Sequence, residues 1–264
     1  MSKKIKVQLA GGLGNNMFQL ACGKAYSLKY NREFVVLDNK IGITHGTLLS
    51  YKDNVLSNIN ISENEKGVYN VYNEPCFHYE EITNFMDENV FLRGYFQSAK
   101  HFSGYESEIK ELFKYPEEYL VSIKEKYKDI LSKETCSIHV RRGNYLQLSD
   151  IHPPQSMAYY MKALKKMPKD CLFIIFSDDI QWCKDNFPED HEKFIFIENS
   201  VDHEDMCLMS MCSHNIIANS SFSWWGAWLN KNPNKIVVAP KIWFGPNMMK
   251  NDTKDLYCEK WIIL

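Results

Sequence analysis

The chain has 264 residues, with 31 Lys and Arg against 33 Asp and Glu, so its formal net charge is −2. This near balance excludes a global electrostatic attraction to nucleic acid, and any anion must be bound by a local group of residues. Because 45% of the residues are hydrophobic, the chain can bury a substantial core.

The N-terminus, Met-Ser-Lys-Lys-Ile-Lys-Val, is basic, but its apolar run is too short for a signal peptide. No stretch of the sequence reaches the roughly 18–20 apolar residues of a membrane-spanning helix. We therefore expect a cytoplasmic protein without a membrane span. The basic N-terminus is compatible with peripheral association at the inner membrane.

Strand and helix signals alternate along the chain. In the first half, strands are predicted at residues 5–10, 33–38 and 89–96. Helices are predicted after the first strand, where apolar residues recur at helical spacing from Met17 to Leu28, and near 104–115 and 117–131. Residues 39–88 are polar and irregular, and no element is assigned there.

The second half has a clearer alternation. Strands are predicted at residues 136–141, 171–177, 194–197, 214–218 and 235–239, separated by helices near 156–167, 179–187, 203–212 and 223–230. This order is typical of a parallel sheet with right-handed crossovers. We therefore predict an α/β protein with a domain boundary near residue 133, in which 134–264 form one Rossmann-like domain.

The eight cysteines are scattered and include no Cys-x-x-Cys pair, which favours reduced and mostly buried thiols. A zinc site can be drawn from His203, Cys207, Cys212 and His214, but this spacing matches no standard ligand pattern. We therefore predict no metal at these four residues.

The most informative stretch is Cys-Ser-Ile-His-Val-Arg-Arg-Gly-Asn-Tyr at residues 136–145. An apolar strand leads directly into His139, Arg141 and Arg142. Ligands of α/β proteins bind at the carboxyl ends of the strands, and forked guanidinium groups match phosphate oxygens. The alternative is an internal ion pair between an arginine and a carboxylate. His139 is equally compatible with a ligand contact or with a histidine satisfied in the core.

A glycine-rich stretch, Gly11-Gly12-Leu13-Gly14-Asn15-Asn16-Met17, lies between the first strand and its helix. It is a weak dinucleotide fingerprint, because Met17 replaces the third glycine and Asp38 is only a candidate for the acidic residue. Glycine does allow backbone N–H groups to approach a phosphate or a sugar. An ordinary tight turn is the alternative.

Two further polar groups follow predicted strands. Asp178 and Asp179 directly follow the strand predicted at 171–177. One is expected to cap the next helix, and the other to recognise a base or ribose or to hold a metal. Asn-Ser-Ser-Phe-Ser at 219–223 begins a helix, where free N–H groups favour an anion. Trp224 and Trp228 of that helix fit core packing better than a sugar platform.

Together, His-Val-Arg-Arg-Gly-Asn-Tyr, Gly-Gly-Leu-Gly-Asn and Asn-Ser-Ser-Phe-Ser-Trp-Trp-Gly-Ala resemble the α-1,2-fucosyltransferase family, glycosyltransferase family 11, in the expected order over nearly the whole chain. The resemblance implies a GT-B-like fold, with two Rossmann-like domains facing across a cleft. Residues 1–133 would form the acceptor-side domain, and 134–264 the domain that binds the GDP-sugar. It also implies transfer of L-fucose from GDP-β-L-fucose to the 2-hydroxyl of a terminal galactose, with inversion and without a required metal or other cofactor. We expect a role in bacterial surface polysaccharide biosynthesis.

The resemblance also suggests roles for individual residues. Arg141 is expected to stabilise the departing β-phosphate, and Arg142 to give structural or phosphate support. The residues expected to bind the donor are His139 and Asp178 or Asp179 at the guanosine, Asn219, Ser220, Ser221 and Phe222 at the phosphates, and Gly12, Gly14 and Asn15 from the N-terminal domain.

Asn144 departs from the family pattern, which usually has Asp after Arg-Arg-Gly. A carboxamide is no general base and carries no charge to orient the arginines, so another group such as Asp150 would serve as the base, or the reaction would proceed dissociatively with little base help. A module that binds sugar nucleotides or glycans without turnover, and a transferase that uses another GDP-sugar, remain the alternatives.

Overall fold

The computed structural model describes residues 3–37, 47–62, 64–83, 88–190 and 192–264. The chain forms two compact units: Met1–Pro116 with Asn251–Cys258, and Glu117–Lys250 with Glu259–Leu264. The domain boundary expected near residue 133 lies inside the second unit, because the helices at 117–131 belong to that unit. Asp38, the acidic candidate for a dinucleotide site, lies outside the described residues.

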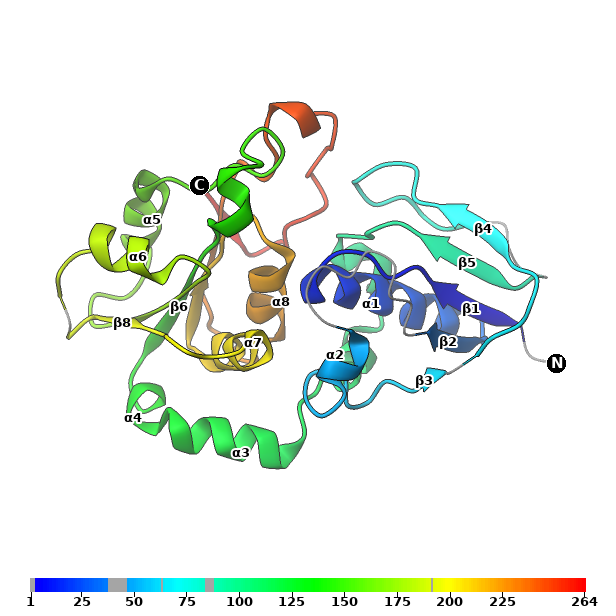
Figure 1. Cartoon of the computed structure of the whole chain (residues 1–264), viewed down its shortest axis with the longest axis horizontal. Helices are drawn as coiled ribbons and strands as arrows, with labels where there is room; N and C mark the ends of the chain where they lie inside the picture. Colours follow the sequence, from blue (N-terminus) through cyan, green and yellow to red (C-terminus); the bar gives the residue numbers. More distant parts are fainter. Residues whose placement is uncertain (1–2, 38–46, 63, 84–87, 191) are drawn as a thin grey trace. The chain divides into compact units, whose positions relative to one another are not determined.

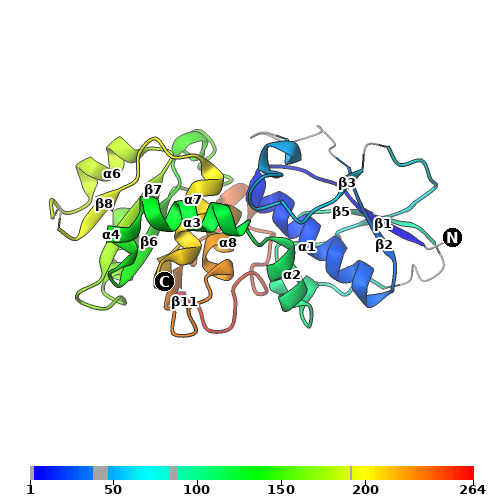
Figure 2. The ribbon, with the colours of Figure 1, turned by 90° about the horizontal axis from the view of Figure 1, so that it is seen from below.

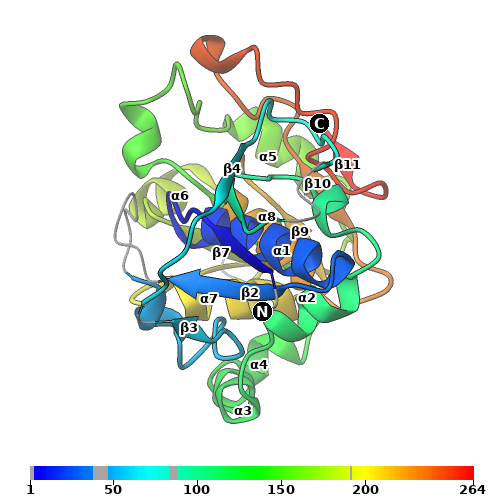
Figure 3. The same cartoon turned by 90° about the vertical axis from the view of Figure 1, so that its right-hand side faces the viewer.

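The first unit contains a five-stranded sheet in the order β3-β2-β1-β5-β4, and every strand pair is parallel. Its elements are β1 (Lys4–Val7), α1 (Leu13–Lys29), β2 (Glu33–Leu37), η1 (Leu48–Tyr51), β3 (Ile61–Ser62), β4 (Asn70–Asn73), β5 (Val90–Arg93), η2 (Ala99–Phe102) and α2 (Glu106–Leu112). Figure 3 shows β1 and β2 with α1 packed against them. The sequence did not indicate β3 and β4, because two strands this short and polar carry no run of alternating apolar residues.

The second unit contains a six-stranded parallel sheet in the order β11-β10-β9-β6-β7-β8. Its elements are α3 (Glu117–Lys126), α4 (Lys128–Leu131), β6 (Thr135–Val140), η3 (Gly143–Leu146), α5 (Met157–Leu164), β7 (Leu172–Ser177), α6 (Ile180–Asn186), β8 (Phe194–Phe196), α7 (Asp202–Met211), β9 (His214–Ile216), α8 (Ser221–Leu229), β10 (Val237–Ala239), η4 (Pro246–Met248) and β11 (Ile262–Ile263). All five strands predicted in this half are present, and β11 is an additional edge strand.

Helices cover both faces of the second sheet, which explains why its central strands are apolar throughout. On one face, Ile138 and Ile175 pack with residues of α5 and α6; on the other, Ile174 packs with residues of α7. Figure 1 shows α5 and α6 on one side of β6, with α7 and α8 on the other. Figure 2 shows α3 lying along α7.

The strand order of the second sheet reverses direction at β6. The chain proceeds from β6 through β7 to β8 on one side, and then returns through β9 to β10 and β11 on the other. In open α/β sheets, ligands bind at such a switch point, outside the carboxyl ends of the strands. Here that point lies between β6, which leads to Arg141, and β9, which leads to Asn219. The fold therefore brings two of the sequence motifs to one edge.

Lys235 holds the carboxyl end of α8. Its Nζ donates to the backbone oxygens of Ala227 and Asn230, both at 2.7 Å. A cation that satisfies the last carbonyls of a helix also complements the helix dipole. We expect Lys235→Met to lower the free energy of unfolding by about 1–3 kcal/mol, which urea denaturation would measure. The exposed Lys165→Met serves as the control, and an equal effect of both changes would contradict this role of Lys235.

The cysteine prediction is confirmed: all eight thiols are free, and six of them are buried. The residues considered for zinc do not form a cluster. His203 Nδ1 lies 2.6 Å from the Tyr119 hydroxyl, while His214 Nδ1 accepts from the backbone N–H of Ile236. In the described part of the chain, no helix combines the length and apolar character needed to cross a membrane.

Candidate functional site

Three strand ends bring the predicted residues of the second unit together. In the sheet, β6 lies between β7 and β9, with His139 beside Phe176 and Val140 beside Ser177. Arg141 and Arg142 therefore emerge next to the aspartates that follow β7, and also next to the turn that follows β9. This arrangement places most of the predicted donor-binding residues at one edge of one sheet.

Arg141 is held by two oxygen partners. Its Nη1 lies 3.0 Å from Oδ2 of Asp178, and its Nη2 donates to Oδ1 of Asn144 at 2.8 Å. The guanidinium also lies over the Tyr145 ring, 5.4 Å from its centroid. The alternative of an ion pair with a carboxylate is thus confirmed, and it does not preclude a ligand. The side chain keeps 24% of its surface exposed, and a guanidinium has five N–H donors.

Arg142 is fixed in a different way. Its Nε donates to Oδ2 of Asp179 at 3.0 Å, and its guanidinium lies 3.9 Å from the centroid of the Trp182 ring. Its backbone N–H donates to Oδ1 of Asp178 at 2.8 Å. Of the two roles considered for Arg142, these contacts favour structural support.

The two aspartates have different roles, and one of them caps the next helix as predicted. Asp179 is the N-cap of α6, because its Oδ1 accepts from the backbone N–H of Trp182. Asp178 instead holds Arg141 and the backbone of Arg142. Both carboxylates are therefore parts of the arginine cluster, and two positive and two negative charges balance there.

Asn144 orients Arg141 although it carries no charge, which corrects the expectation from the sequence. Its side-chain oxygen accepts from the guanidinium at 2.8 Å, so a carboxamide supplies the hydrogen bond that an aspartate would supply. Asp150, the candidate for the base, lies in the exposed turn after η3, where its backbone oxygen accepts from the N–H of Asn247 at 2.9 Å.

His139 is buried at the end of β6, with 6% of its surface exposed. Its ring lies 5.5 Å from the ring of Phe222, and its Nδ1 is buried without a hydrogen-bond partner among the described residues. Burial, followed by the charge of Arg141, lowers the pKa of His139 to about 3. The imidazole is therefore neutral at physiological pH, with a polar atom left for a ligand or a water molecule.

This burial predicts a pH dependence of stability. Between the ordinary histidine pKa of 6.5 and the lowered pKa of about 3, the unfolded chain binds a proton that the folded chain does not. The contribution of His139 to stability is therefore complete above about pH 6.5 and is lost as the pH falls toward 3, with a loss of about 2 kcal/mol between about pH 8 and pH 5. Urea unfolding of wild type and His139→Asn at both pH values tests this expectation. A difference between the two proteins that does not change with pH would contradict it.

The turn that follows β9 leads into the N-terminus of α8. Ser220 is the N-cap residue of α8, but its side chain makes no capping hydrogen bond, and Ser223 Oγ bonds to the Ser220 carbonyl instead. Ser221 begins the helix, and Phe222 follows it. The first N–H groups of a helix carry partial positive charge and favour an anion.

Asn219 has a partly structural role in this turn. Its Nδ2 donates to the carbonyls of Pro153 and Trp243, both at 3.0 Å, while its Oδ1 is buried without a hydrogen-bond partner among the described residues. The tryptophans of α8 are core residues, as predicted: Trp224 and Trp228 stack with centroids 6.3 Å apart and are buried.

Tyr145 and His152 belong to this site but were not indicated by the sequence. The Tyr145 hydroxyl donates to the carbonyl of Asn219 at 3.1 Å, and its ring stacks on His152 with centroids 5.0 Å apart. Burial raises the pKa of Tyr145 to about 12. Tyr145 thus links Arg141 to the turn before α8. In the sequence, the signal that could have indicated Tyr145 was its position at the end of the His-Val-Arg-Arg-Gly-Asn-Tyr motif.

The glycine-rich stretch of the first unit forms a turn that is fixed by amide side chains. Gly11 has φ +78°, where a Cβ would also lie 2.3 Å from Asn15 Nδ2. Asn16, which is buried, donates to the carbonyl of Ala10 at 3.1 Å, and the Asn15 oxygen accepts from Gln97 Nε2 at 2.9 Å. Gly12 is the N-cap residue of α1, and Gly14 lies in its first turn.

Comparisons with known proteins identify the family and the fold of the chain. The model of the family described as Glycosyl transferase family 11 matches residues 1–264. Two relatives from Escherichia coli are an O-antigen biosynthesis glycosyltransferase, WbnK, 31% identical over 97% of this chain and 99% of the relative, and an α-1,2-colitosyltransferase, 32% identical over 98% of each.

A solved structure of the fucosyltransferase NodZ from Bradyrhizobium is also similar. It has a TM-score of 0.53 and 14% sequence identity, and the match covers 86% of this chain and 93% of that one. The predicted α/β, GT-B-like fold is thereby confirmed. Both the family match and the two relatives cover nearly the whole sequence, so the chain belongs to glycosyltransferase family 11.

Proposed function

We propose that this glycosyltransferase moves L-fucose from GDP-β-L-fucose to the 2-hydroxyl of a terminal galactose, forming an α-1,2 linkage. The observation that carries the proposal is the position of Arg141, exposed in part and held by Asp178 and Asn144, at the sheet edge that also leads to the N-terminus of α8. Both features favour a diphosphate. The choice of fucose rests on the three sequence motifs.

In this proposal, electrostatic stabilisation of the leaving group is the main catalytic contribution. As the bond between the sugar and the β-phosphate breaks, negative charge develops on the departing GDP and positive charge on the sugar carbon. Asp178 and Asn144 hold the guanidinium of Arg141 before the donor arrives, so little reorganisation is needed when that charge appears. The N–H groups of α8 add a second fixed source of positive potential.

The protein supplies this positive charge without a metal in our proposal. Arg141 neutralises charge on the β-phosphate, His139 and Asp178 line the guanosine, and the buried neutral imidazole offers Nδ1 as a polar contact. Asn144 does not act as the general base in this proposal, because an amide does not accept a proton at neutral pH. The reaction then proceeds dissociatively, with Asp150 as the candidate for proton removal.

A second donor is favoured by a specific observation. One relative, 32% identical over 98% of this chain, is an α-1,2-colitosyltransferase. Colitose is fucose without the 3-hydroxyl group, so both sugars have the same ring orientation and the same methyl group. A site that hydrogen-bonds the 3-hydroxyl rejects the deoxy sugar by about 10⁴-fold, whereas an apolar wall there does not.

Paired donor assays test the proposal. GDP-fucose, GDP-colitose and GDP-mannose are compared at equal concentrations with lactose as the acceptor, and the linkage of the product is determined by NMR. The proposal predicts the highest kcat/KM with GDP-fucose and a fucose linked α-1,2 to galactose. A preference for GDP-colitose or GDP-mannose would show that GDP-fucose is not the donor. Binding of the GDP-sugars without turnover for any of a panel of acceptors would identify a binding module.

A further inference from the structure

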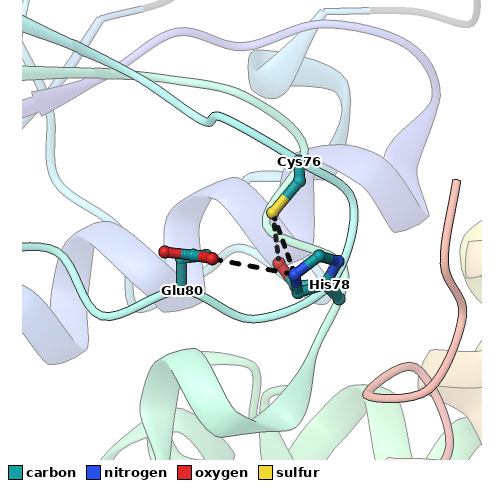
Figure 4. A group of neighbouring side chains, drawn as sticks. All are labelled: Cys76, His78 and Glu80. Atoms are coloured by element: carbon teal, nitrogen blue, oxygen red, sulfur yellow. Dashed lines mark hydrogen bonds and ion pairs between the residues drawn. The ribbon is translucent and has the colours of Figure 1, made fainter.

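A cluster of metal-ligating side chains lies in the first unit, immediately after β4. Cys76, His78 and Glu80 alternate along an irregular segment, and their ligand atoms all lie within 4.8 Å of one another. Figure 4 shows the Cys76 sulfur and the Glu80 carboxylate directed toward the His78 ring. Among the described residues, this is the one group of three such side chains.

The distances fit the ligands of a tetrahedral zinc ion. Cys76 Sγ lies 3.4 Å from His78 Nε2, and His78 Nε2 lies 3.7 Å from Glu80 Oε1. Zinc bonds of about 2.3 Å to sulfur and 2.0–2.2 Å to nitrogen or oxygen, at tetrahedral angles, separate sulfur from nitrogen by about 3.6 Å and nitrogen from oxygen by about 3.4 Å. The side chains therefore need only small movements to coordinate one ion.

An outer carboxylate completes the arrangement. His78 Nδ1, the nitrogen that faces away from Cys76, lies 4.0 Å from Oδ2 of Asp252. Histidines that bind a metal through one ring nitrogen commonly donate the other N–H to a carboxylate, which fixes the tautomer. Asp252 comes from the segment Asn251–Cys258, which rejoins the first unit. The ligand segment and this returning segment thus meet at His78.

The charge and exposure of the cluster also suit a cation. Glu80 and Asp252 bring negative charge, Lys254 balances part of it at 3.4 Å from Asp252, and the Glu80 side chain is 56% exposed. An ion can therefore reach the ligands from solvent. One thiolate, one imidazole and one carboxylate match the preference of Zn²⁺ and do not suit Mg²⁺ or Ca²⁺, which favour oxygen ligands.

We propose that Cys76, His78 and Glu80 bind one Zn²⁺ ion, with water as the fourth ligand and Asp252 supporting His78. Binding displaces the thiol proton of Cys76 to solvent, and the imidazole coordinates through Nε2 in its neutral form. The ion joins the segment after β4 to the segment that carries Asp252, so its effect is on the stability of the first unit. The proposed zinc ligands belong to the first unit, and the arginine cluster belongs to the second.

Zinc binding to the full chain tests this proposal. The protein is stripped with EDTA, exchanged into chelator-free buffer under reducing conditions and titrated with ZnCl₂ against a chromophoric chelator, while Co²⁺ reports thiolate ligation by its absorption. The expected result is one ion per chain and a raised melting temperature. Cys76→Ser and His78→Gln should weaken binding by more than about 100-fold, and Asp252→Asn by about 10–100-fold.

Cys258→Ser is the matched control, because Cys258 is another half-buried thiol of the same unit. It should bind zinc as tightly as wild type. Circular dichroism of each variant without metal shows whether it is folded, and Glu80→Gln gives a second, conservative test. Absence of zinc binding by wild type, or binding that Cys76→Ser and His78→Gln leave unchanged, would overturn the proposal.

Discussion

Replacing Arg141 with alanine is expected to lower kcat for sugar transfer by about 10²–10³, because a preorganised charged donor is lost where negative charge develops. Donor affinity should fall less, since much of the interaction forms only as the leaving group departs. The variant also leaves Asp178 without its guanidinium partner. Single-turnover transfer and equilibrium binding of the GDP-sugar, measured separately, distinguish the two effects.

Lysine at position 141 should not restore the rate. One ammonium group does not reproduce the fork that reaches Asp178 through Nη1 and Asn144 through Nη2. Arg32→Ala is a matched control, because Arg32 lies before β2 and bonds to the Glu88 carbonyl. An Arg141→Ala enzyme with normal kcat, or an equal loss in Arg32→Ala, would contradict the role given to Arg141.

Gly143→Ala is the second change from which we expect a large effect. A Cβ at this position would lie 2.4 Å from Asp178 Oδ2. The carboxylate cannot move without loosening its contacts with Arg141 and with the backbone N–H of Arg142. We expect kcat/KM to fall by about 10²-fold, because displacement of a group that positions the catalytic residue disturbs its geometry.

A double-mutant cycle separates this mechanism from general damage to the fold. If Gly143→Ala acts by displacing the Asp178 carboxylate, it should have little further effect on kcat/KM in an Asp178→Ala background. Thermal unfolding of all four proteins shows whether each is folded. Fully additive losses would mean that the alanine acts through another contact.

Much of the second unit could be predicted from the sequence. Its central strands are buried on both faces, so they appear as short apolar runs such as Leu172–Ser177, separated by helical periods. Less of the first unit could be predicted, because β3 and β4 are held by pairing with neighbouring strands rather than by an apolar pattern of their own. Local sequence carries no record of such pairing.

For the site too, the sequence predicted which residues lie together but not which residues contact each other. The motifs indicated which residues gather at the strand ends, since parallel strands bring their carboxyl ends to one edge. They did not indicate the partners: Arg141 with Asp178 joins residues far apart in the chain, and Tyr145 with Asn219 joins two motifs. The orienting role of Asn144 was not predicted, because the prediction rested on the missing charge of the carboxamide and not on its oxygen as an acceptor for Arg141.

The most direct test of the account measures GDP release from GDP-fucose by the wild-type enzyme, with and without lactose, in buffer that contains EDTA. We predict release that depends on lactose and yields fucose linked α-1,2 to galactose, because the protein's own cations stabilise the departing diphosphate. An enzyme that binds GDP-fucose but releases no GDP with lactose or any other galactose-terminated acceptor would contradict the proposed transfer. Release restored only by added Mg²⁺, which the ligands Cys76, His78 and Glu80 do not suit, would contradict catalysis by Arg141 without a metal.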